Sequence, residues 1–174
     1  INGYQYFIRT AAGSTVHPVA SSTVYPNSTG SVLQTTLYDY SWFDGTNRVR
    51  RLTTTHPEIG AAQNGPAGGD VEAAYYDEYG RETWFKDGGG FLHGTAYNDA
   101  TGGVVAEVVD ARTAGLPIEF AAPYDGSATP SGGGLNLVTR YEVDALGRAV
   151  KMTDPANRVT HWVYRDAQRE VRTY

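Results

Sequence analysis

Short runs in which apolar and polar residues alternate are the main structural signal along this chain. The runs AVKMT (149–153) and VTHWVY (159–164) alternate in the way expected of a β-strand with one buried face. Two further runs, ETWFK (82–86) and FLHGTAY (91–97), are separated by the turn-forming sequence DGGG. No stretch of about a dozen residues has a clean helical period with caps. The pattern therefore predicts an all-β chain with little or no helix.

The turns between these runs recur at a regular spacing. In each of two regions, the aspartates at the expected turns are separated by 10 and then by 12 residues. This repetition indicates a unit of about 22 residues that contains two strands and two turns, and such units build an antiparallel β-sheet. The aspartates are Asp77, Asp87 and Asp99 in the first region, and Asp144, Asp154 and Asp166 in the second.

Two of these turns share the pattern Asp-x-x-Gly-Arg. The aspartate carboxylate can accept hydrogen bonds from backbone N–H groups a few residues later, which stabilises a type I turn. The glycine then takes the left-handed conformation that a three-residue hairpin loop with a bulge requires. The pattern occurs as Asp77, Gly80 and Arg81, and again as Asp144, Gly147 and Arg148.

Other expected turns carry variations of this pattern. Where glycine is absent, asparagine is expected in its place, because it tolerates positive φ better than other non-glycine residues. The sequence after Asp166 lacks the glycine and is one residue short, so it fits the pattern least well. The remaining predicted turns are Asp44 with Asn47, Asp99 with Gly102, and Asp154 with Asn157.

Three segments interrupt the repeat. Residues 10–35 are rich in Ser, Thr, Ala and Gly and predict short strands with loops, and residues 56–70 predict a loop that crosses between two parts of the sheet. Residues 111–135 contain three prolines and the run SGGG, and they predict an irregular excursion. No linker is polar enough to mark a domain boundary. We expect one continuous repeat segment over residues 1–174, as a fragment of a longer chain.

Charge and composition exclude several functional classes. The chain has a net charge of −5, and its sequence contains no basic stripe that could replace the counterions of nucleic acid. No apolar run approaches the roughly 18–20 residues of a membrane helix. The absence of cysteine excludes disulfides, thiolate catalysis and cysteine-type zinc sites. We therefore expect neither a nucleic-acid partner nor membrane insertion.

The repeat turns resemble those of a known family. Tyr76-Asp77-x-x-Gly80-Arg81 and Tyr141-x-x-Asp144-x-x-Gly147-Arg148 look like the YD repeat of the Rhs/YD-repeat family. The resemblance covers residues 36–55, 71–110 and 137–174, and it does not extend to residues 1–35 or 111–135.

The resemblance implies a curved antiparallel β-sheet of two-strand repeats, within a spiral shell or a β-solenoid-like assembly. Members of this family form shells of bacterial polymorphic toxins and insecticidal toxin complexes, and extracellular domains of teneurins. An extracellular or cell-surface location is therefore implied, with any targeting signal outside this segment. In toxins the shell encloses an effector that is often released by self-cleavage at an Asp-Pro-rich motif. Asp154-Pro155 instead fits an ordinary turn, so no cleavage residue is carried over.

Candidate catalytic groups are few. A carboxylate paired with a guanidinium, as in Asp77 with Arg81, could act on a substrate. Because the arrangement recurs at a structural spacing, a turn cap with an ion-paired or stacked arginine is the better interpretation. The four histidines form no metal-ligand motif, and the chain has no nucleophile elbow, phosphate loop or calcium loop. We predict no catalytic, metal-binding or cofactor-binding residue.

Aromatic residues on the strands are the remaining candidates for a binding site. Such side chains usually fill a core or stack across strands, but they can also form a platform for a sugar ring. The predicted candidate glycan contacts are Trp84 and Trp162, with the loop 111–135 nearby.

Together these features predict a non-enzymatic structural segment that forms a β-sheet shell, tube or fibre. The sheet would enclose cargo such as an effector domain, or join neighbouring repeats or copies of itself through its edges. The alternative is a module that binds glycans or a cell-surface partner, and an enzyme is the third alternative.

Overall fold

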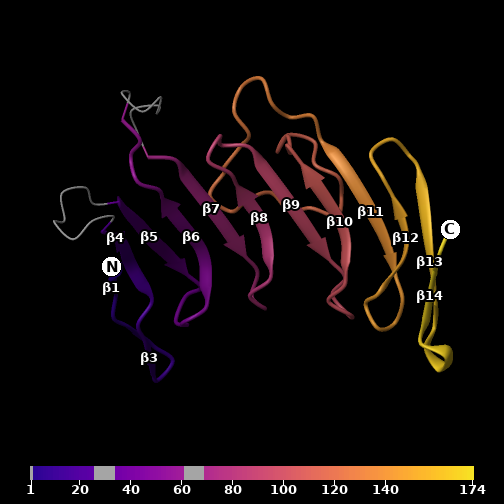
Figure 1. The fold of residues 1–174 in the computed structure, drawn as a ribbon, viewed down its shortest axis with the longest axis horizontal. Helices are drawn as coiled ribbons and strands as arrows, with labels where there is room; N and C mark the ends of the chain where they lie inside the picture. The colour runs from indigo at the N-terminus through magenta and orange to yellow at the C-terminus, as the bar shows by residue number, and fades with distance from the viewer. Residues whose placement is uncertain (1, 26–33, 61–68) are drawn as a thin grey trace. The chain divides into compact units, whose positions relative to one another are not determined.

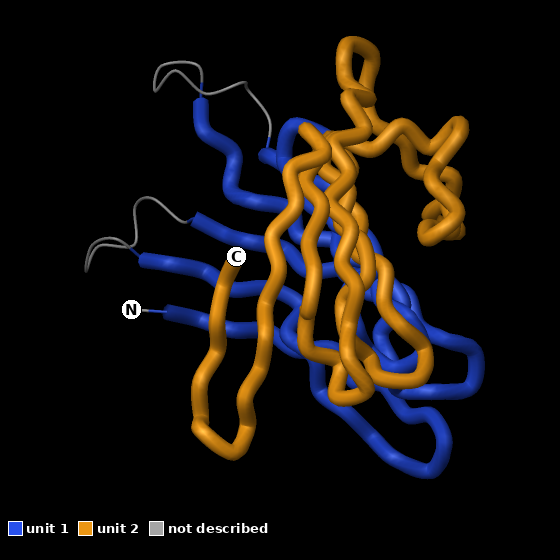
Figure 2. The backbone as a smooth tube through the Cα atoms, turned by 90° about the vertical axis from the view of Figure 1, so that its right-hand side faces the viewer, with its two compact units in different colours: residues 1–90 blue, residues 91–174 orange. Residues whose placement is uncertain are grey.

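The computed structural model describes residues 2–25, 34–60 and 69–174, and these residues are mainly β-strands and turns (Figure 1). The described helical element is a three-residue 3₁₀ turn, η2 (Asp166–Gln168). The prediction of an all-β chain with antiparallel strands is therefore confirmed. The chain forms two compact units, residues 1–90 and 91–174 (Figure 2). That it is one continuous repeat segment stays a prediction.

The first unit contains antiparallel strands in the order β1-β4-β5-β6-β7-β8. A separate two-stranded hairpin, β2–β3, is inserted between β1 and β4, which pair with each other. The sheet strands are β1 (Asn2–Tyr6), β4 (Val19–Val24), β5 (Gln34–Trp42), β6 (Val49–Thr55), β7 (Val71–Tyr76) and β8 (Glu82–Lys86), and the hairpin strands are β2 (Arg9–Ala11) and β3 (Ser14–Val16).

The second unit is an antiparallel meander in which each strand pairs with the next one along the chain. Short turns connect its strands, except between β10 and β11. The strands are β9 (Leu92–Tyr97), β10 (Val104–Val109), β11 (Leu137–Val143), β12 (Ala149–Thr153), β13 (Val159–Arg165) and β14 (Glu170–Thr173).

Alternation along the strands places the core of the second unit on one face. Leu92, Gly94 and Ala96 of β9 are buried, while the residues between them are only partly buried. Ala106 lies opposite Ala96, and Val108 lies opposite Gly94, so the buried residues of β9 and β10 share this face. The alternating pattern of the sequence therefore corresponds here to strands with one buried face.

The core of the first unit is centred on a cross-strand aromatic pair. Tyr75 on β7 lies opposite Trp84 on β8, and only 3% and 4% of their surfaces are exposed. The prediction that Trp84 contacts a glycan is therefore wrong, because a ligand cannot reach this side chain. The alternating pattern identifies the strand, but it does not show which face other residues cover.

The excursion between β10 and β11 is a loop closed at its base. No strand is assigned over residues 110–136, which agrees with the irregular excursion predicted for residues 111–135. The Asp110 carboxylate accepts hydrogen bonds from the backbone N–H groups of Gly134 (2.8 Å) and Leu135 (3.0 Å). The N–H of Asn136 donates to the Asp110 carbonyl oxygen at 3.0 Å. One buried carboxylate thus joins the two ends of the loop.

The other two predicted interruptions lie partly outside the described residues. Strands β2, β3 and β4 account for much of residues 10–24, in agreement with the short strands expected there. Residues 56–60 and 69–70 carry no strand, in agreement with the expected loop. The remaining parts of these two predictions fall on residues 26–33 and 61–68, outside the described residues.

Candidate functional site: the repeat corners

The turn between β7 and β8 shows how the Asp-x-x-Gly-Arg pattern works. Asp77 Oδ1 accepts hydrogen bonds from the backbone N–H groups of Tyr79 and Arg81, both at 2.9 Å. Its Oδ2 accepts a 2.6 Å hydrogen bond from Arg81 Nε. Gly80 has a φ of 81°, and its N–H donates to the Asp77 carbonyl oxygen at 3.1 Å. The aspartate therefore caps the turn, the glycine permits it and the arginine clamps the aspartate.

The same set of bonds recurs at Asp144 and Asp154. At Asp144 the donors are the Leu146 and Arg148 N–H groups (2.9 and 3.0 Å) and Arg148 Nε (2.8 Å). At Asp154 they are the Ala156 and Arg158 N–H groups (2.9 and 2.8 Å) and Arg158 Nε (2.6 Å). Gly147 (φ 77°) and Asn157 (φ 62°) hold the left-handed position. Asparagine therefore replaces glycine where the sequence predicted it would.

The turn at 98–103 differs from the prediction by one residue. The capping side chain belongs to Asn98 rather than Asp99: Asn98 Oδ1 accepts hydrogen bonds from the N–H groups of Ala100 (3.0 Å) and Thr101 (2.9 Å). Gly102, with a φ of 71°, donates its N–H to the Asn98 carbonyl oxygen at 2.8 Å. The loop is one residue longer than at Asp77, so the cap moves back by one position.

The turn at 43–48 also departs from the prediction. Gly45 takes the left-handed position (φ 67°), not Asn47. Phe43 closes the turn, because its N–H donates to the Arg48 carbonyl oxygen and its own carbonyl oxygen accepts from the Thr46 N–H. The expectation that Asp44 caps this turn and that Asn47 replaces glycine is therefore wrong. A glycine directly after Asp44 fixes the left-handed position two residues earlier than the pattern assumes.

Two further turns close with related geometry. The N–H of Gly90, which has a φ of 86°, donates to the Asp87 carbonyl oxygen at 2.8 Å. After β13, η2 begins at Asp166, and Arg169 takes the left-handed position with a φ of 52°. A turn therefore forms at Asp166, as expected, although an arginine stands where the pattern has glycine or asparagine.

We use the name corner for five turns that each follow an odd-numbered strand. They join β5 to β6, β7 to β8, β9 to β10, β11 to β12 and β13 to β14, and their residues are 43–48, 77–81, 98–103, 144–148 and 166–169.

Successive corners of the first unit are linked by side chains. The Asn47 amide donates to the carbonyl oxygens of Ala11 (3.2 Å) and Ser14 (2.9 Å) in the β2–β3 hairpin. The next residue, Arg48, reaches in the other direction and donates through Nη1 to the Glu78 carbonyl oxygen at 2.6 Å. Asn47 and Arg48 therefore connect their own corner to the β2–β3 hairpin and to the next corner.

The second unit repeats this arrangement with different chemistry. Gly103 lies so close to the next corner that an added Cβ would be 2.5 Å from the Gly147 carbonyl oxygen. Arg148 reaches forward: Nη1 and Nη2 donate to the Asp166 carboxylate at 2.6 and 3.3 Å, and the guanidinium lies over the Tyr164 ring, 4.2 Å from its centroid. Gly147 therefore contacts the corner before it, and Arg148 contacts the corner after it.

Asn47-Arg48 and Gly147-Arg148 occupy equivalent places in the two units. In each dipeptide the first residue contacts a segment that precedes its own corner, the β2–β3 hairpin for Asn47 and the corner at 98–103 for Gly147. The arginine of each dipeptide binds the next corner. The sequence reveals the local pattern, but not this second role, because the partners lie 18 to 44 residues away. Arg158 provides a contrast, since its side chain is 83% exposed and is paired with Asp154 of its own turn.

Hydrogen bonding lowers the pKa of the carboxylates in three turns. Burial alone would raise the pKa of Asp77 and Asp144, but hydrogen bonds from the backbone and guanidinium of Arg81 or Arg148 outweigh it. For Asp154 the backbone N–H of Arg158 makes the largest contribution to the lowered pKa. The Asp166 and Asp144 carboxylates in turn raise the pKa of Arg148.

These shifts predict a loss of stability in acid. A carboxyl group whose pKa is lowered by folding stabilises the protein fully above the ordinary pKa of aspartate, about 4. That stabilisation is lost as the pH falls through the lower pKa of the folded state. We expect the melting temperature to decrease once the pH is lowered below about 4. Asp77→Asn should make the melting temperature less dependent on pH in this range, because the amide carries no charge. Thermal melts across the acid range test this, and an unchanged slope in Asp77→Asn would contradict it.

The left-handed glycine of the corner predicts a second effect. Gly80→Val forces a β-branched residue to a φ of 81°, so we expect it to lose about 1–3 kcal/mol of unfolding free energy. Gly80→Asn is the matched control and should lose much less, since Asn157 holds the same position with a φ of 62°. Urea unfolding measures both. If Gly80→Val unfolds at the same urea concentration as the parent, the glycine is not needed at this corner.

Candidate binding residues outside the corners give a mixed result. Trp162 is half-buried on β13, and its role as a glycan contact stays a prediction. The first unit holds an aromatic cluster in which Tyr40 stacks on Trp42 and meets Phe7 edge to face. Arg9 lies over the Trp42 ring at 4.6 Å and donates to the Thr46 carbonyl oxygen. This cluster helps to hold the inserted hairpin against the corner at 43–48.

Within the described ranges, no three His, Cys, Asp or Glu residues are grouped so that they could hold a metal ion. The described residues also contain no helix that is long and apolar enough to cross a membrane. No protein-family model matches the chain, and no curated protein matches it. The similarity to YD repeats therefore stays a prediction.

Proposed function

We propose that the chain is a non-enzymatic structural segment of a large YD-repeat protein at the cell surface or outside the cell. Its β-sheet would form part of a shell, tube or fibre that encloses cargo or assembles with other copies of the chain. The observation that carries this proposal is the contacts between successive corners within each compact unit, above all the bonds that Arg148 makes to both Asp144 and Asp166. Contacts that recur between neighbouring repeats are the basis of a repeat structure, in which each repeat is stabilised by the next one.

The edges of the sheet indicate how such a segment joins its neighbours. Among the described residues, β14 pairs with β13 alone, so every second backbone N–H and C=O of β14 points away from the sheet. His161 and Tyr174 exchange both of their backbone hydrogen bonds at 3.0 Å. By alternation, the backbone groups of Thr173 and Val171 face outward. An exposed edge of this kind recruits another strand, from a neighbouring repeat or from a second copy.

The test measures association of the purified chain over a range of concentrations, by sedimentation velocity and electron microscopy. We expect concentration-dependent assembly. Val171→Pro removes an outward N–H without breaking the β13–β14 ladder, so it should abolish assembly through β14, whereas the matched control Val171→Ala should not. A chain that stays monomeric at every concentration would contradict the proposed assembly, and association unchanged in Val171→Pro would exclude this edge.

The alternative of a glycan-binding module has less support. Trp84 is buried, which removes one of its two predicted contacts. The structural proposal is the one that the corner geometry favours.

A further inference from the structure

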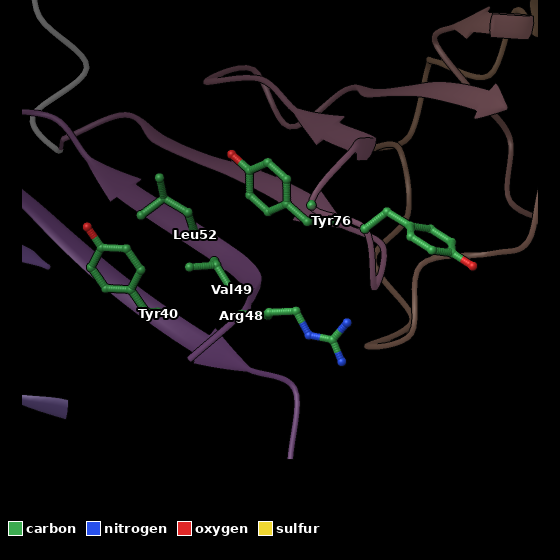
Figure 3. A pocket seen from close by; sticks show the side chains of 7 residues that line it. Tyr40, Arg48, Val49, Leu52 and Tyr76 are labelled. Atoms are coloured by element: carbon green, nitrogen blue, oxygen red, sulfur yellow. The ribbon is translucent and has the colours of Figure 1, made fainter. Parts of the chain in front are cut away.

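A pocket of about 320 Å³ opens on the first unit, between the corners at 43–48 and 77–81 (Figure 3). Tyr40, Leu52 and Ala74 are successive cross-strand neighbours on one face, and Ala74 is a small residue in this row between Leu52 and Phe85. The lining residues are Tyr40, Arg48, Val49, Leu52, Tyr76, Tyr79 and Gly80.

The floor and walls of this pocket are apolar. Val49 and Leu52 lie between the rings of Tyr40 and Tyr76 in Figure 3. The Tyr40 hydroxyl is already used, since it donates to the Val19 carbonyl oxygen at 3.0 Å. Few groups remain that could satisfy the many hydroxyls of a sugar, so the lining fits a compact apolar or aromatic body better than a saccharide.

Arg48 supplies the only formal charge in the lining. Its Nη1 is held by the Glu78 carbonyl oxygen, which fixes the guanidinium beside the pocket. Nε and Nη2 have no hydrogen-bond partner within the described residues and can donate to a ligand. Glu82 lies across from Tyr76 on β8 but does not line the pocket. A fixed guanidinium with two open donors matches a carboxylate.

We propose that this pocket binds a small organic anion with an apolar body, such as an aryl carboxylate. The ring would lie between Tyr40 and Tyr76, over Val49 and Leu52, and the carboxylate would bind Arg48. This binding activity is separate from the structural role proposed above, and neither depends on the other.

The test is a titration of the full chain with 3-phenylpropionate, followed by two-dimensional NMR of the backbone amides. A ligand this small in a half-open pocket should bind with a dissociation constant of roughly 1 mM. We expect saturable shifts confined to residues 48–52 and 76–80. The neutral 3-phenylpropionamide should bind several-fold more weakly, because it lacks the charge that Arg48 recognises.

Three variants give the titration its controls. Val49→Phe should fill the pocket and abolish binding, whereas Val159→Phe, at an exposed position on β13, should leave it unchanged. Tyr79→Ala removes a wall residue that is 81% exposed, so it should weaken binding without affecting the fold, even if Val49→Phe proves unstable. Shifts that do not saturate, that map elsewhere, or that persist in Val49→Phe with a native melting curve would overturn the proposal.

Discussion

Trp84→Ala is expected to lose about 3–5 kcal/mol of unfolding free energy, the usual cost of deleting a buried aromatic side chain. Trp84 has 4% of its surface exposed and lies opposite Tyr75, which has 3% exposed. Removing the indole therefore leaves a cavity beside a second large ring, in a sheet with few other fully buried residues. Urea unfolding followed by far-ultraviolet circular dichroism measures the loss.

Trp162→Ala is the matched control for this experiment. Trp162 is half-buried on β13, so its removal should lose clearly less stability than the removal of Trp84. Equal losses in the two variants would show that Trp84 is not a core residue. A Trp84→Ala chain as stable as the parent would contradict the placement of the aromatic pair.

Gly103→Val is expected to give the second large effect, at or above the upper end of the roughly 1–3 kcal/mol typical of overpacked sites. A Cβ at Gly103 would be 2.5 Å from the Gly147 carbonyl oxygen and 3.0 Å from the Gly147 Cα. Both atoms belong to the backbone of the next corner, so no side-chain rotation can relieve the clash. Two adjacent corners would have to move apart.

Gly60→Ala controls for the general effect of replacing glycine. Nothing lies within 4 Å of a Cβ built at Gly60, so this change should be close to neutral. Gly103→Ala should already be destabilising, and Gly103→Val more so, in equilibrium unfolding of the three variants. If all three unfold together, the corners at 98–103 and 144–148 do not pack as described.

The sequence predicts most of what is local in this fold. The bonds to Asp77, Asp144 and Asp154 span at most four residues, so a short pattern contains all of their partners. The same reasoning fails where a turn changes length. Asn98 replaces Asp99 as the cap because the loop is one residue longer, and spacing alone does not reveal this change.

Contacts between distant segments could not be predicted in this way. The sequence predicts Trp84 as a candidate glycan contact, yet its side chain is buried, because alternation shows that one face of a strand is buried but not which one. Asn47 was expected to take the left-handed position of its own turn, but its amide binds the β2–β3 hairpin instead. The forward reach of Arg48 and Arg148 depends on which strands are neighbours, and only the folded sheet determines that.

Arg148 binds both its own corner, through Asp144, and the next corner, through Asp166. Hydrogen–deuterium exchange of the Arg169 amide, which donates to the Asp166 carbonyl oxygen, tests this claim in Arg148→Leu. Arg158→Leu is the matched control, because Arg158 is 83% exposed and pairs with Asp154 of its own turn. We expect exchange at Arg169 to become several-fold faster in Arg148→Leu and to stay unchanged in Arg158→Leu. Faster exchange confined to residues 144–148 in Arg148→Leu would contradict it.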